Sequence, residues 1–235
     1  MPLTTRFVPD NAALEIEGGT SVPIEADPAI WDLLPWGDQT SVAATFEQIT
    51  LREALEALAR KLGLTFVLRD QSVQIRPMPA LRRLGRRATV QEIAVLDLLA
   101  STPAKAQGGT ASANQLLQLI DTQLQEAKSP FAIENRAFDA TTGQAQVPLA
   151  RNFTLAEALE SIHRSTGATW YPWGDSIIVS SKEDQVRTQL ARTIDARFNG
   201  VELSQVLSEL SQRAGVPFAI EPGAVQQVAP GLRSE

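Results

Sequence analysis

The sequence contains no cysteine and only one histidine, His163. The absence of thiols excludes disulfides, thiolate metal sites and a cysteine nucleophile. With a single histidine, only an all-oxygen metal site is conceivable, and the acidic residues do not follow the Asp/Asn/Gly spacing of a calcium loop. We therefore expect no metal, no cofactor and no enzymatic activity, and we expect His163 to be a partly buried residue at the edge of a helix.

Long apolar runs and surplus positive charge are also missing. No segment approaches the roughly 18 to 20 continuous apolar residues of a membrane span, and the start, Met1-Pro2-Leu3-Thr4-Thr5-Arg6, lacks the apolar stretch of a signal peptide. The net charge of -6 argues against a general nucleic-acid binder, because phosphate contacts need surplus Lys and Arg.

What the sequence does contain is an internal repeat. Three segments place apolar residues at helical spacing, and each is followed at the same distance by a glycine suited to the left-handed position that ends a helix. The segments are residues 50–55, 154–159 and 202–207, and the glycines are Gly63, Gly167 and Gly215. Thr50 with Glu53 and Thr154 with Glu157 form capping boxes in the first two copies.

The repeat extends to strands on both sides of the helix. After the first two glycines, residues 64–67 and 73–75, and then 168–171 and 177–179, flank turn residues and predict β-hairpins. A strand is expected before each helix, at 42–46, at 147–149 and at Phe198. Residues 130–134 also match 217–221 one for one, with 23–25 as a degraded relative.

These echoes predict an α+β fold of tandem small modules, each with two helices packed against small mixed β-sheets in the order helix, strand, strand, helix, hairpin. Residues 1–80 are an atypical first module and 112–182 a complete one. Residues 186–235 are the first half of a third, from which we expect that the natural protein continues. Between them, 81–111 is a basic segment, a helix capped by Thr89 with Glu92, and a flexible linker rich in Ala, Gly, Ser and Thr that runs to about residue 113.

The stretches from Phe46 to Gly63 and from Phe198 to Gly215 share the pattern F-x-x-[IV]-x-L-x-x-[AV]-L-x-x-L, followed by glycine and an aromatic residue. The pattern resembles the short amino-terminal domain shared by secretins and TonB-dependent outer-membrane transducers, and the carboxy-terminal domain of some anti-sigma regulators. The resemblance implies an α+β sandwich in the periplasm that works by protein–protein contact, packing side by side in rings or docking a signalling partner.

Turn aromatics and strand edges are the candidate partner-binding residues. The tetrapeptide Pro-Trp-Gly-Asp occurs twice, and Trp36 and Trp173 either cover their own turns or anchor a partner. Tyr171 is expected on the face opposite Trp170, where it would join that patch. Ile177 and Val179 are expected on an exposed sheet edge, as is the strand at 73–75.

The only dense positive charge is Arg82, Arg83, Arg86 and Arg87. These arginines form either a solvated linker or a site for an anionic partner such as lipid headgroups or an acidic protein face. Nucleic acid is the weakest of the three interpretations, because no aromatic platform accompanies the arginines.

The sequence thus favours a non-catalytic interaction or assembly module of a bacterial envelope protein, periplasmic after removal of a signal sequence, with a cytoplasmic location as the alternative. Its partner is another protein or a second copy of the chain, and a membrane-proximal position is compatible with it. The alternatives are a small-ligand-binding or hydrolytic envelope protein with an unrecognised pocket, and a purely architectural spacer.

Overall fold

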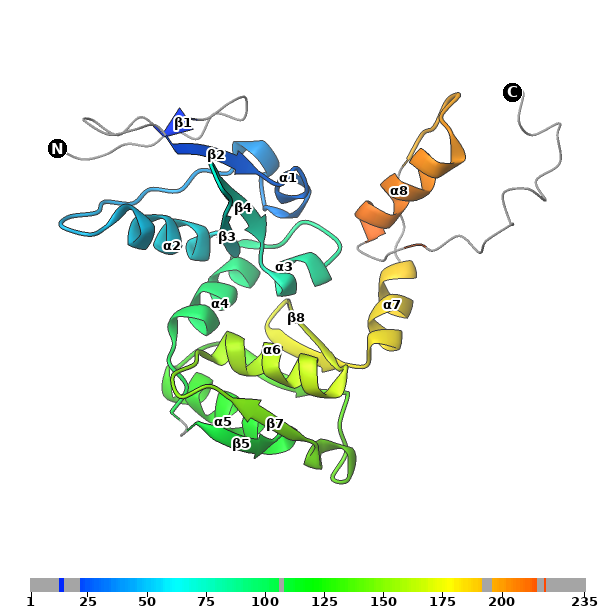
Figure 1. Cartoon of the computed structure of the whole chain (residues 1–235). Coiled ribbons are helices and arrows are strands. Elements are labelled where there is room, and N and C mark those ends of the chain that lie inside the picture. The colour runs from blue at the N-terminus through cyan, green and yellow to red at the C-terminus, as the bar shows by residue number, and fades with distance from the viewer. Residues whose placement is uncertain (1–12, 15–21, 106–107, 192–195, 215–217, 219–235) are drawn as a thin grey trace, which may run out of the picture.

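The computed structural model describes residues 13–14, 22–105, 108–191, 196–214 and 218. These residues form an α+β fold of helices and three small sheets (Figure 1). The N-terminal part comprises β1 (Ala13–Leu14), β2 (Val22–Ala26), α1 (Ala29–Leu33), the 3-10 turn η1 (Gly37–Gln39), α2 (Leu51–Lys61), β3 (Leu64–Leu68) and β4 (Val73–Pro77).

The rest of the described chain continues with α3 (Pro79–Arg83), α4 (Val90–Ser101), β5 (Gly109–Ser112), α5 (Ala113–Glu126), β6 (Ala132–Asn135), the 3-10 turn η2 (Thr142–Gln144) and β7 (Gln146–Leu149). It ends with α6 (Leu155–Thr166), β8 (Thr169–Trp173), β9 (Ser176–Ser180), α7 (Lys182–Leu190) and α8 (Leu203–Ala214). No helix in the described ranges is both long enough and apolar enough to cross a lipid bilayer.

The helix boundaries follow the local signals. Capping boxes begin α2 at Thr50, α4 at Thr89 and α6 at Thr154, as predicted. Ser112 forms a further one at α5 that the sequence analysis missed. Gly63 and Gly167 have φ values of 65° and 75° and end α2 and α6 in the left-handed conformation. Gly215 lies outside the described residues.

Two sheets share one order of three strands, and in the first of them β1 also pairs antiparallel with β2. In the first, β4 pairs parallel with β2 and antiparallel with β3; in the second, β9 pairs parallel with β6 and antiparallel with β8. Residues 24–25 and 133–134 occupy the same place in these two sheets, on the strand parallel to the central one. Both predicted hairpins are therefore present. The second copy of the 130–134 echo, 217–221, is described only at Phe218.

Two of the three strands expected before the helices do not form. Residues 42–46 alternate between half-buried and exposed but pair with no strand, and Phe198 is likewise outside any strand. An alternating pattern of apolar residues indicates that one side of a segment is covered. It does not indicate that another strand lies beside the segment to form backbone hydrogen bonds. The third expected strand is β7, which pairs with β5.

The segment 81–111 differs most from expectation. Its apolar residues lie in one continuous core shared with both halves of the fold, and α4 contacts both α2 and α6. The residues after α4 are also ordered by contacts, because Ala104 N–H donates to Phe153 O at 2.8 Å and Leu155 N–H to Thr102 O at 3.0 Å. Residues 102–104 thus bond to the chain at the start of α6, and β5 pairs with β7 and packs on α5, where the sequence suggested a linker.

The repeated helix residues are placed comparably in two copies. Leu55 on α2 and Leu159 on α6 are buried in the interior, while Leu207 on α8 is half-buried. Helix α8 lies apart from the sheets in Figure 1. Of the third expected module, residues 186–235, the structure describes only 186–191, 196–214 and 218.

Candidate functional site

The strands predicted to be exposed edges are central strands. β9, which carries Ile177 and Val179, is hydrogen bonded to β6 on one side and β8 on the other, and both side chains are fully buried. β4 lies between β2 and β3. The edge prediction was wrong because each hairpin receives a third strand from earlier in the chain, on the outer side of its second strand.

The first sheet ends instead at the two-residue β1 on one side and at β3 on the other. Two hydrogen bonds at the ends of the β3–β4 hairpin, from Arg69 N–H to Ser72 O (2.8 Å) and from Met78 N–H to Gly63 O (2.9 Å), show which residues of β3 bond to β4. Thr65 and Val67 accordingly bond to β4, and the N–H and C=O groups of Leu64, Phe66 and Leu68 point outward. Val67 and Leu68 are 39% and 62% exposed, so this edge is also apolar.

Both outer strands of the second sheet are covered. On β6 the Ile133 N–H donates to Asp121 Oδ1 at 3.1 Å. On β8 the Trp170 carbonyl accepts from Arg83 at 3.3 Å, α3 packs alongside, and Pro172 removes a donor. β3 therefore differs from β6 and β8, because no strand among the described residues pairs with its outward N–H and C=O groups.

The candidate aromatic residues occupy unlike positions. Trp36 is 56% exposed before η1. Trp173 is half-buried in the β8–β9 turn, with the Arg86 guanidinium 4.2 Å from its ring centroid and Tyr171 edge-on at 6.2 Å. Tyr171 is 4% exposed, which contradicts its expected place on a solvent face, because α3, α4 and α6 all contact β8 and its neighbouring residues are buried as well. Only Trp36 retains the exposure of an anchor.

The arginine cluster is divided among separate contacts. Arg82 pairs with Asp27, and Arg83 makes a two-pronged pair with Glu160 at 2.7 and 2.9 Å. Arg86 pairs with Glu92, and exposed Arg87 lies beside Gly37. Three of the four arginines thus connect α3 and its following turn to other elements, where the sequence suggested a solvated linker or an anionic partner.

Glu92 is a buried junction between α4 and the β8–β9 turn. Its fully buried carboxylate accepts from Arg86 at 2.6 and 2.9 Å, from Thr89 N–H at 2.8 Å and from Gly174 N–H at 2.9 Å. Burial by itself raises the pKa of Glu92, but these hydrogen bonds outweigh it and hold the pKa below its ordinary value. No local sequence signal reveals the contact with Gly174, which lies 82 residues away.

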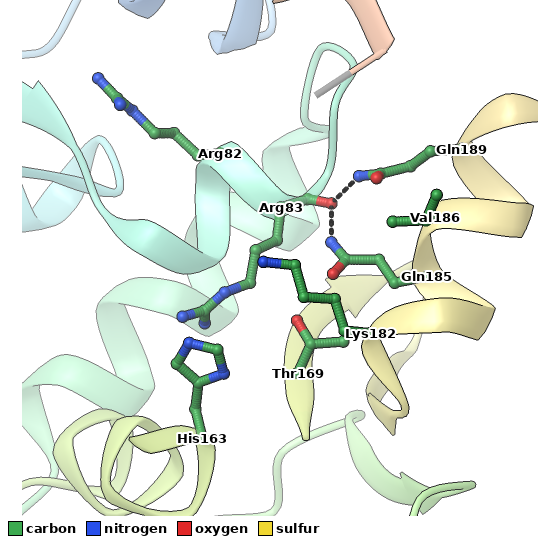
Figure 2. Close-up of a pocket in the computed structure, with 8 residues that line it drawn as sticks. All are labelled: Arg82, Arg83, His163, Thr169, Lys182, Gln185, Val186 and Gln189. Carbon is green, nitrogen blue, oxygen red and sulfur yellow. Dashed lines mark hydrogen bonds between the residues drawn. The ribbon is translucent and has the colours of Figure 1, made fainter. Parts of the chain in front are cut away.

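A pocket lies where α3, α6, β8 and α7 meet (Figure 2). His163 lines it from α6, half-buried as expected, with Nδ1 2.6 Å from Ala168 O. A carbonyl only accepts, so Nδ1 carries the proton and Nε2 is left for another partner. Within the described residues, three or more His, Asp or Glu side chains nowhere gather closely enough to hold a metal ion.

Comparison of the chain with protein-family models, with curated proteins and with solved structures finds no match.

Proposed function

We propose that this chain is a non-catalytic interaction module of a bacterial envelope assembly, and that it binds a partner by adding a strand to β3. The observation that carries the proposal is the open, apolar edge of β3, with Val67 and Leu68 exposed beside outward backbone groups. Such an edge is a template for a strand of another chain, because the backbone groups give affinity and the alternate side chains give selectivity.

The contrast between the two similar sheets supports this assignment. Asp121 and Arg83 occupy backbone groups at the edges of the second sheet, which is a common protection against unwanted pairing. The equivalent protection at β3 is missing among the described residues. The placement in the periplasm rests on the resemblance of the helix-glycine-hairpin pattern to secretin and TonB-system domains, and it is part of the proposal.

The partner is an extended segment of another protein or β3 of a second copy. Two β3 strands can pair antiparallel about a twofold axis, which gives a closed dimer. The alternative function, binding of a small ligand, is favoured by one observation, the pocket between α3 and α7.

The test replaces Leu68 with lysine, since a lysine on an edge strand opposes pairing while leaving the β3–β4 ladder intact. Leu190→Lys on α7 is the matched control, because Leu190 is 57% exposed and Leu68 is 62% exposed. Sedimentation velocity over a range of concentrations measures self-association, and a labelled peptide of residues 63–69 measures capture of an extended strand.

We expect Leu68→Lys to weaken self-association or peptide capture by at least about tenfold, equivalent to about 1.4 kcal/mol of binding free energy. Leu190→Lys should leave both unchanged. A wild-type protein that stays monomeric and captures no peptide, or equal effects of the two lysines, contradicts the proposal.

A further inference from the structure

The pocket between α3, α6, β8 and α7 has a volume of about 150 Å³ and opens to solvent. This space holds several water molecules or one small polyatomic ion. Apolar atoms, including those of Val186 on α7, form much of its wall, and the polar and basic groups come from Arg83 on α3, His163 on α6, Thr169 on β8, and Lys182, Gln185 and Gln189 on α7. Arg82 also borders it, but Figure 2 shows its side chain directed away from the other residues.

One part of the lining is held in place by internal contacts. Gln185 and Gln189 both donate to the Arg83 carbonyl, at 2.8 and 2.6 Å, and so fix α7 against α3. The Arg83 guanidinium is paired with Glu160, so its charge is already compensated. These groups form a preorganised wall, and a ligand does not have to displace them.

The other part of the lining is unengaged. Neither the Lys182 ammonium group nor the Thr169 hydroxyl has a hydrogen bond or ion pair with any described residue. Thr169 is 2% exposed as a whole residue and lines the pocket. His163 adds a free Nε2, because its Nδ1 is occupied by Ala168 O.

The nearest acids on α7 do not neutralise Lys182. Glu183 pairs with Arg187 at 2.6 Å, and Asp184 accepts from the Ser181 hydroxyl at 2.7 Å. The site therefore combines an uncompensated positive charge, a hydroxyl donor and an imidazole around a small space. This set suits an oxyanion and repels a metal cation.

We propose that this pocket binds a small oxyanion of the phosphate class, with Lys182 supplying the charge, Thr169 donating a hydroxyl hydrogen bond and His163 Nε2 accepting one from a protonated phosphate oxygen. The ligand is either a free phosphate or the phosphate monoester of a larger molecule, lipid headgroups included. This inference is independent of the β3 edge, because none of the pocket residues lies on β3 or β4.

The test is titration of the full chain with inorganic phosphate, followed by calorimetry and by amide chemical shifts. We expect saturable binding that Lys182→Ala and the isosteric Thr169→Val each weaken by about tenfold or more, as for loss of one hydrogen bond to a charged group. Lys61→Ala, which removes an exposed lysine at the end of α2, should leave the affinity unchanged. Circular dichroism of each variant confirms that the fold is retained.

Two results overturn the proposal. One is the absence of saturable binding to the wild type at phosphate concentrations up to about 10 mM, above the millimolar range of weak specific affinity. The other is that Lys182→Ala and Lys61→Ala weaken phosphate binding equally, because the binding would then depend only on the overall charge of the protein. A parallel co-sedimentation with phosphatidylcholine vesicles containing phosphatidic acid identifies the source of the phosphate, because only a headgroup ligand brings the protein down in a Lys182-dependent manner.

Discussion

Replacing Glu92 with glutamine tests whether the buried junction between α4 and the β8–β9 turn stabilises the fold. The carboxylate is fully buried and receives four hydrogen bonds, two of them from Arg86. Glutamine keeps the size but has one acceptor oxygen and an NH2 group. That NH2 group would face donors: the Arg86 guanidinium or a backbone N–H of Thr89 or Gly174.

The expected loss of stability follows from the Arg86 guanidinium, which loses its charged partner. Removing one member of a buried ion pair costs about 3–5 kcal/mol, and Arg86 is 29% exposed, which places the loss at the low end of this range. We expect Glu92→Gln to lower the free energy of unfolding by about 3 kcal/mol. At about 2–4 °C per kcal/mol for a chain of this size, the melting temperature should fall by about 6–12 °C.

The assay is urea unfolding followed by tryptophan fluorescence, since Arg86 lies 4.2 Å from the Trp173 ring centroid and its release also alters local emission. The matched control is Glu53→Gln. Glu53 occupies the same capping-box position in α2, but it is exposed and has no arginine partner in the described structure. Its replacement should change stability far less.

The pH dependence has a definite sign. The pKa of Glu92 is lowered in the folded protein, so its contribution is present above the unfolded pKa, about 4.3, and is lost as the pH falls through the folded value. The difference in stability between wild type and Glu92→Gln should therefore be largest near neutral pH and shrink below about pH 4. A Glu92→Gln variant no less stable than Glu53→Gln, or a difference that persists unchanged to acid pH, would refute the reasoning.

Two further changes test the backbone arrangement. Gly63→Ala places a Cβ at a φ of 65° and 3.1 Å from Leu96 Cδ1, so we expect a loss of about 1–2 kcal/mol in the free energy of unfolding, measured by urea titration; an unchanged midpoint would contradict the strain. Val179→Pro breaks the pairing of a central strand, so far-ultraviolet circular dichroism should show loss of the fold, and a native spectrum would argue against the position of β9.

Local features of the fold were predictable from the sequence because their causes are local. The capping box of Thr154 and Glu157, which are only three residues apart, determines the start of α6, and Gly167 determines its end. The α+β class and both hairpins follow from the same short-range signals. The strand that pairs with each hairpin was not predictable, because β2 is separated from β4 by two helices, a 3-10 turn and a strand.

The candidate site was predicted poorly for the same reason. Arg83 meets Glu160 across 77 residues, so the run of arginines looked like a solvated segment when most of its members are paired. Alternation assigned Tyr171 to solvent, but the burial of β8 depends in part on α3 and α4, which are distant in the sequence. The edge at β3 became identifiable only when the neighbours of β4 were known.

The position of β4 and β9 in their sheets has a consequence for synthesis on the ribosome. Each is the last strand of its sheet to be translated, yet it lies between two earlier ones, β2 and β3 in the first sheet and β6 and β8 in the second. β3, β6 and β8 therefore emerge from the exit tunnel with no strand to pair with, and β2 has only the two-residue β1, until residues 73–77 or 176–180 arrive. The nascent chain is most exposed to misassembly during these two intervals, and completion of one strand closes each of them.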